Sequence, residues 1–142
     1  DPSQEEFNLR RSIRTDENGR YCFRSVLPVG YSVPPGGATD VILKKLGRHG
    51  HRPAHIHFFV TAEGQRKLTT QINIDGDPYL WDDFAFATRE GLVPEVKKES
   101  DPEVIKKYDM NGPFSHIEFN FDLHADRQNL ISTEVTRARA QA

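Results

Sequence analysis

Residues 52–62 read Arg-Pro-Ala-His-Ile-His-Phe-Phe-Val-Thr-Ala, and this stretch decides how the whole chain is interpreted. Apolar residues alternate from Ala54 onward, which predicts a β-strand over 54–62, because successive side chains on a strand point to opposite faces. His55 and His57 then share the face opposite the apolar one. Two imidazoles on one face can bind one metal ion, but the same pattern also fits a polar, half-exposed face.

The histidine pair by itself leaves zinc, copper, iron and manganese open, since imidazole binds all four. The sequence has one cysteine, Cys22, so a zinc ribbon or zinc finger is excluded on ligand count. Tyr31 lies in a loop rich in proline and glycine and is a candidate third ligand, although a lone tyrosine there is more often packed on a turn. A phenolate would favour ferric iron, because tyrosine, with an ordinary pKa of about 10, ionises at neutral pH only beside a strong Lewis acid.

Other segments predict short strands joined by turns. We expect a hairpin formed by 4–13 and 20–26, a strand over 66–74 that follows the 54–62 strand, and a last strand over 116–123. Short helices are expected from Thr39 or Asp40 to Leu46 and over 100–108, with a helical turn within 81–90. This order indicates an all-β fold, a β-sandwich of mixed strands with short helices in the connecting loops. We expect residues 1–124 to form one domain and 125–142 a polar C-terminal tail.

The charge balance and the lack of long apolar runs bear on whether the protein binds a nucleic acid or a membrane. The 142 residues include 19 basic and 21 acidic side chains, which gives no basic field for binding a nucleic acid. No apolar run reaches the length of a membrane span. We therefore predict a cytoplasmic protein that binds neither nucleic acid nor membrane.

Four motifs, in order along the chain, resemble the intradiol ring-cleaving dioxygenases, and most closely their catechol branch. They are Pro-Val-Gly-Tyr at 28–31, the stretch 46–59 around the histidine pair, Leu-Thr-Thr-Gln-Ile-Asn at 68–73, and Gly-Asp-Pro-Tyr-Leu-Trp-Asp-Asp-Phe-Ala at 76–85. The resemblance runs from about Phe7 to about Leu123. It implies cleavage of catechol or a substituted catechol by dioxygen, giving cis,cis-muconate, at a non-haem ferric iron.

The resemblance also implies roles for individual residues. Tyr31, His55 and His57 are the iron ligands, and Tyr31 is the ligand that the substrate displaces and that accepts a proton from it. Arg52 is a catalytic and substrate-binding residue that stabilises negative charge, with a surface arginine bonded to a carbonyl as the alternative. Substrate-binding positions are also assigned to Gln71, Phe84, Ala85 and Val33, for which a solvated strand face or plain core packing is the alternative.

One family ligand, a second tyrosine, has no match in the sequence. Tyr21 lies in a strand that aligns with a non-ligand strand, so we expect the second tyrosine on a segment that precedes Asp1, and the catalytic domain to be N-terminally incomplete. The full-length protein is expected to be a homodimer. Two alternatives remain open: a cupin-like metal-binding protein, since Gly50, the histidine pair and Glu63 approximate a cupin motif, and an inactive β-sandwich fragment that lacks the fourth ligand.

Overall fold

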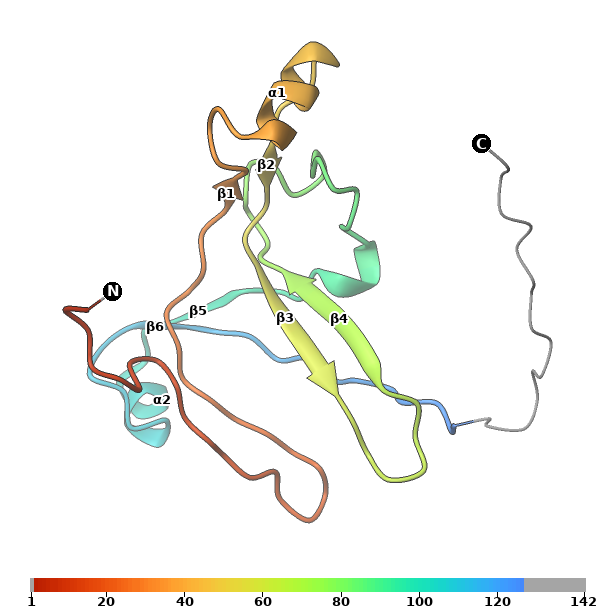
Figure 1. Ribbon diagram of the computed structural model, residues 1–142. Coiled ribbons are helices and arrows are strands. Elements are labelled where there is room, and N and C mark those ends of the chain that lie inside the picture. The colour runs from red at the N-terminus through yellow and green to blue at the C-terminus, as the bar shows by residue number, and fades with distance from the viewer. Residues whose placement is uncertain (1, 127–142) are drawn as a thin grey trace.

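The computed structural model describes residues 2–126. Their elements are β1 (Tyr31–Ser32), α1 (Ala38–Lys45), β2 (His51–Arg52), β3 (His55–Val60), β4 (Leu68–Asn73), the 3-10 helix η1 (Glu90–Leu92), β5 (Lys97–Glu99), α2 (Pro102–Lys107) and β6 (Phe114–His116). The strands form three antiparallel pairs, β1–β2, β3–β4 and β5–β6. The predicted combination of short strands with a few short helices is confirmed. The predicted β-sandwich is not confirmed, because these two-stranded sheets are small and do not close on one another (Figure 1).

The β3–β4 hairpin is the longest regular unit, and it matches the two strands predicted at 54–62 and 66–74. Its register places His55 opposite Asn73 and His57 opposite Gln71. Residues that lie directly opposite in an antiparallel pair point to the same side, so these four polar side chains share one face of the hairpin. The apolar face carries Ile72, which is 2% exposed.

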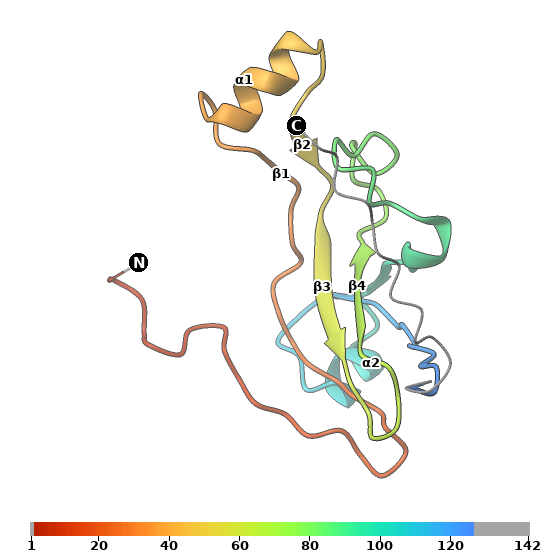
Figure 2. The same ribbon diagram turned by 45° about the vertical axis from the view of Figure 1, so that its right-hand side comes forward.

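The β1–β2 pair brings the proline-rich loop against the residues just before the histidine strand. Tyr31 lies opposite Arg52 in this register. A Cβ atom on Gly30 would lie 2.9 Å from the Arg52 carbonyl oxygen and 2.9 Å from Asp77 Oδ2, so a larger residue would separate the two segments. Helix α1 extends beyond this pair at one end of the molecule, as the two views show (Figures 1 and 2).

Both predicted helices form, but with different N-terminal caps. Gly37, not Thr39 or Asp40, is the N-cap of α1, and Asp40 instead accepts hydrogen bonds from the backbone of Gly36 and from Lys44. Helix α2 begins at Pro102, and the side chain of Asp101 accepts a hydrogen bond from the Glu103 amide. Within 81–90 the chain makes successive turns, and the 3-10 helix starts only at Glu90.

Two strand predictions are wrong. No strand forms within residues 4–26, although the predicted turn does, with Asp16 Oδ1 accepting hydrogen bonds from the amides of Asn18 and Arg20. This segment runs as irregular chain in both views (Figures 1 and 2), and the rings of Tyr21 and Phe23 pack against Phe58 of β3. The last strand covers only Phe114–His116, so 117–123 lies outside it. A strand needs a partner edge as well as a suitable pattern, and these segments pair with none along most of their length.

The core is small and contains polar groups. Its buried apolar side chains are Leu43, Ala54, Ile72, Ile74 and Leu80, while Gln71, Asn73 and Asp83 are buried polar residues. In the described part of the chain, no helix is long and apolar enough to cross a membrane. Most of the predicted tail at 125–142 lies outside the described residues, but Ala125 forms a bridge with Gln65 at the hairpin turn.

Candidate metal centre

His55 and His57 lie side by side on β3, as the alternating pattern predicts. Their ring centroids are 4.8 Å apart and the rings are nearly perpendicular, at 86°. His55 is half-buried and His57 is exposed. The prediction that both imidazoles share one face is confirmed, while their role as metal ligands stays a prediction.

The ring of His55 has a defined orientation. Its Nδ1 lies 2.7 Å from the carbonyl oxygen of Pro53, which can only accept, so Nδ1 carries the proton and donates it. The lone pair is therefore on Nε2, which accepts a hydrogen bond from Arg52 Nη1 at 3.3 Å. Burial lowers the pKa of His55 below its ordinary value, and the positive charge of Arg52 lowers it further. This imidazole is neutral and correctly oriented for metal binding through Nε2.

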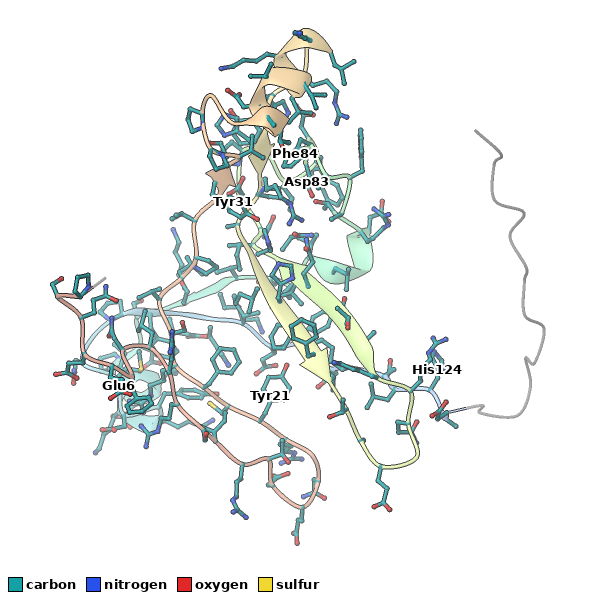
Figure 3. The ribbon with its side chains drawn as sticks, in the orientation of Figure 1. Glu6, Tyr21, Tyr31, Asp83, Phe84 and His124 are labelled. Carbon is teal, nitrogen blue, oxygen red and sulfur yellow. The ribbon has the colours of Figure 1, made fainter. Side chains whose placement is uncertain are left out.

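Tyr31, the predicted third ligand, lies on β1. Its ring centroid lies 5.6 Å from that of His55, and the residue is 52% exposed. Figure 3 shows Tyr31 at the same end of the molecule as Asp83, whereas Tyr21 lies near the opposite end of β3. Between residues 2 and 126, no group of three or more His, Cys, Asp or Glu side chains could hold a metal ion. A site at the histidine pair therefore depends on the phenol of Tyr31.

Arg52 and Asp83 form a buried ion pair beside these three rings. Arg52 Nε lies 3.2 Å from Asp83 Oδ1, and Arg52 Nη2 lies 3.3 Å from Asp83 Oδ2. The two side chains are 12% and 1% exposed. Burial alone would lower the pKa of Arg52, but Asp83 and the Tyr31 phenol raise it above its usual value. Burial would raise the pKa of Asp83, yet the bonds from Arg52 and two backbone amides leave it lowered. Both groups are charged at neutral pH.

Gln71 connects Arg52 to the hairpin. Its Oε1 accepts a hydrogen bond from Arg52 Nη2 at 3.1 Å, and its Nε2 donates to Asn73 Oδ1 at 2.8 Å. Asn73 is fully buried, and its Nδ2 has no hydrogen-bond partner. The prediction that Gln71 and Asn73 point to the same side of β4 is confirmed, and the solvated-face alternative for Gln71 is wrong because this side chain is buried.

Of the remaining predicted substrate-binding residues, Phe84 and Ala85 directly follow Asp83, and Val33 lies against Gly50. The Ala85 amide donates to Asp83 Oδ1 at 3.1 Å, and the Phe84 amide donates to the carbonyl oxygen of His51 at 3.2 Å. Val33 follows β1 and donates its amide to Gly50. Phe84 and Val33 are half-buried and Ala85 is exposed. Their contact with a substrate stays a prediction.

A surface hollow of about 460 Å³ includes Tyr31 in its lining but neither His55 nor His57. It is lined by residues 27–31, His51, Ala54 and residues 74–79. Of the predicted site residues, only Tyr31 is among them. This hollow therefore does not coincide with the pocket expected from Gln71, Phe84, Ala85 and Val33.

Sequence reasoning missed Asp83, the residue that fixes Arg52. It also missed Asp77, whose carboxylate accepts hydrogen bonds from the amides of Ala54 and Tyr79 and so anchors the turn before β3. The doubled carboxylate Asp82-Asp83 was visible in the sequence, but nothing local distinguishes its two members. Asp82 is 80% exposed and pairs with His49, whereas the Asp83 side chain is buried against Arg52.

A family model described as Dioxygenase matches residues 1–126. The chain belongs to this dioxygenase family. Catechol 1,2-dioxygenase 2 of Acinetobacter lwoffii is 78% identical over 98 residues, which is 69% of this chain and 36% of that protein. The catechol 1,2-dioxygenase of Acinetobacter baylyi is 60% identical over 120 residues, covering 84% of this chain and 39% of that one.

Solved structures of the same enzyme class also match. The wild-type catechol 1,2-dioxygenase of Acinetobacter radioresistens aligns with a TM-score of 0.84 and 54% identity, covering 100% of this chain and 46% of the other. The chain thus spans less than half the length of these relatives. The resemblance drawn from the four motifs is confirmed, and the dioxygenase match favours this interpretation over the cupin-like alternative.

Proposed function

We propose that this dioxygenase cleaves catechol, or a substituted catechol, between its two oxygen-bearing carbons with dioxygen, giving cis,cis-muconate at a ferric site held by Tyr31, His55 and His57. The observation that carries the proposal is the convergence of these rings, at 5.6 Å and 4.8 Å between centroids, in a chain similar to catechol 1,2-dioxygenases. The donor set fits the metal. A phenolate is a hard anionic ligand suited to a trivalent ion, and His55 presents a free Nε2 lone pair.

Ferric iron, when bound, would supply a Lewis acid that chelates the two adjacent catechol oxygens and activates the ring toward dioxygen. The protein residues supply the remaining functions. Tyr31, on an exposed two-residue strand after a glycine, is suited to leave its position and accept a substrate proton. Arg52 keeps its charge beside the site and stabilises negative charge on substrate oxygens. Gln71, Phe84, Ala85 and Val33 would contact or enclose the substrate.

One phenolate leaves much of the ferric charge uncompensated, and we propose that a second tyrosinate comes from a segment outside residues 1–142. The sequence has four tyrosines. Tyr21 donates its hydroxyl to the Phe119 carbonyl, Tyr79 stacks on His51, and Tyr108 contacts the rings of Phe114 and His116. These contacts leave Tyr31 as the tyrosine nearest the histidine pair. A cytoplasmic homodimer with a closed β-sandwich domain over 1–124 also remains a prediction for the full-length protein.

The test is to load the full-length protein with ferric iron and follow muconate formation by absorbance. Ferric tyrosinate gives a broad visible charge-transfer band, so the wild type should be coloured and active. Tyr31→Phe should lose the activity and the part of the band that Tyr31 contributes, whereas Tyr79→Phe, the matched control, should keep both in full. Residues 1–142 alone should bind iron poorly and should not turn over. An inactive or colourless wild type, or an active coloured Tyr31→Phe variant, would overturn the proposal.

A further inference from the structure

The guanidinium of Arg52 is held along one edge by Asp83. Nε and Nη2 reach the two carboxylate oxygens at 3.2 Å and 3.3 Å. A two-point contact between a planar guanidinium and a carboxylate fixes the direction of the group as well as its position. Arg52 is a long side chain with many rotamers, so this contact selects one orientation from many.

Asp83 is itself fixed independently of Arg52. Its Oδ1 accepts a hydrogen bond from the Ala85 amide at 3.1 Å, and its Oδ2 accepts one from the Ala87 amide at 3.0 Å. The turn is closed by a backbone hydrogen bond from Phe86 to the Asp83 carbonyl at 2.9 Å. The carboxylate is therefore part of a structured loop, and Arg52 is oriented by a group that does not move with it. Figure 3 shows Asp83 at the same end of the molecule as Tyr31.

The edge held by Asp83 determines which nitrogen faces the candidate metal centre. Nη2 is shared with Gln71 at 3.1 Å, and Nη1 points toward His55 Nε2 at 3.3 Å. His55 Nε2 carries the lone pair that a metal ion would take, because Nδ1 donates to Pro53. A metal ion held by His55 Nε2 would take the lone pair to which Nη1 bonds, while Asp83 and Gln71 remain the acceptors for Nε and Nη2. Nη1 would then be the nitrogen of Arg52 available to a substrate oxygen.

We propose that Asp83 is a positioning residue of this enzyme: it locks the Nε–Nη2 edge of Arg52 so that Nη1 is directed at the substrate oxygens. This inference rests on the proposed function, because it requires a substrate at the centre formed by Tyr31, His55 and His57. Asp83 acts on the substrate through Arg52, and its other hydrogen bonds, from the amides of Ala85 and Ala87, fix the loop that carries it. Its loss should therefore reduce the catalytic benefit of Arg52 without displacing the metal.

The experiment uses the full-length, iron-loaded protein in four variants: Asp83→Asn, Arg52→Ala, the double variant, and Asp82→Asn as the matched control. Asp82 is the neighbouring carboxylate, 80% exposed and paired with His49. Asp83→Asn should lower kcat about tenfold or more, while iron content and the visible band stay at wild-type values. Asp82→Asn should equal the wild type. The double variant should be no slower than Arg52→Ala, because residues that act as one unit are non-additive.

A second readout does not depend on turnover. Catechol is titrated without oxygen, and its binding is followed by the change in the visible band. Asp83→Asn and Arg52→Ala should weaken binding by a similar factor. If Asp83→Asn does not fold, Asp83→Glu takes its place, because it keeps the charge but lengthens the side chain. Asp83→Glu should weaken catechol binding and lower kcat by the factors expected for Asp83→Asn.

Three results would overturn the inference: wild-type kcat in the Asp83 variants, losses that multiply in the double variant, or loss of iron together with activity. The last would make Asp83 a structural residue only. An inactive wild type is a separate outcome, since it overturns the proposed function before any Asp83 variant is compared.

Discussion

Two histidine pairs of identical spacing, His49/His51 and His55/His57, lie close together in the sequence but have different surroundings. His49 binds Asp82 at 3.1 Å through Nε2, and His51 stacks on Tyr79 with centroids 4.3 Å apart and planes 7° from parallel. The first pair thus lies beside a carboxylate and a stacked phenol ring. The second pair lies on one face of a six-residue strand, next to a phenol and a buried guanidinium. The spacing of two histidines is therefore a weak indicator of metal binding, and the side chains around them are the better one.

The largest expected difference between the two histidine pairs is in how much bound iron the protein keeps when one histidine is replaced. His57→Ala in the full-length protein should lose bound iron and the visible band, because a protein ligand is removed and water is a weaker donor than imidazole. His49→Ala should keep both, since His49 is engaged by Asp82. Iron content by metal analysis and the visible spectrum check this prediction. Equal iron loss in the two variants would contradict the distinction between the pairs.

The next effect concerns the arginine that accompanies the second pair. Arg52→Ala should retain iron and colour and lower kcat by about one hundredfold, the usual scale for removing a group that stabilises developing charge. Arg24→Ala is the control, because Arg24 pairs with Asp109 at the surface, where both side chains are more than half exposed. Steady-state kinetics with catechol measures the effect. Loss of iron in Arg52→Ala would instead give Arg52 a structural role.

The smallest effect is on stability and depends on pH. Asp83→Asn should destabilise the iron-free protein by roughly 3 kcal/mol at pH 7, since it leaves a largely buried Arg52 without its counter-charge. The pKa of Asp83 is lowered from its ordinary 3.8, so its stabilisation is fully present above about pH 4. It is lost as the pH falls through the lower folded-state pKa. The difference from wild type should therefore be constant from pH 7 to 5 and shrink below pH 4.

Denaturant unfolding at several pH values measures this difference. Asp82→Asn provides the comparison, because an exposed ion pair contributes at most about 1 kcal/mol. A difference between wild type and Asp83→Asn that grows as the pH falls would contradict the assigned direction of the pKa shift.

Predictions that rest on local pattern succeed best. The alternation in 54–62 correctly places His55 and His57 on one face, and Pro102 correctly marks the start of a helix. Predictions that need a distant partner are less successful. The pattern of 116–123 is typical of a strand, yet only Phe114–His116 pairs, with β5. Strand formation depends on an available neighbouring edge, which the pattern of one segment does not contain.

The sequence by itself determined the family, the histidine strand, the candidate ligands Tyr31, His55 and His57, and the candidate catalytic residue Arg52. The tertiary structure decided which neighbour controls that arginine. Asp82 and Asp83 are chemically identical and adjacent, and only the fold buries one of them against Arg52, 31 residues away along the chain, while the other remains at the surface. The physical reason is that desolvation and pairing of a charge depend on three-dimensional surroundings, which residue type and spacing do not specify.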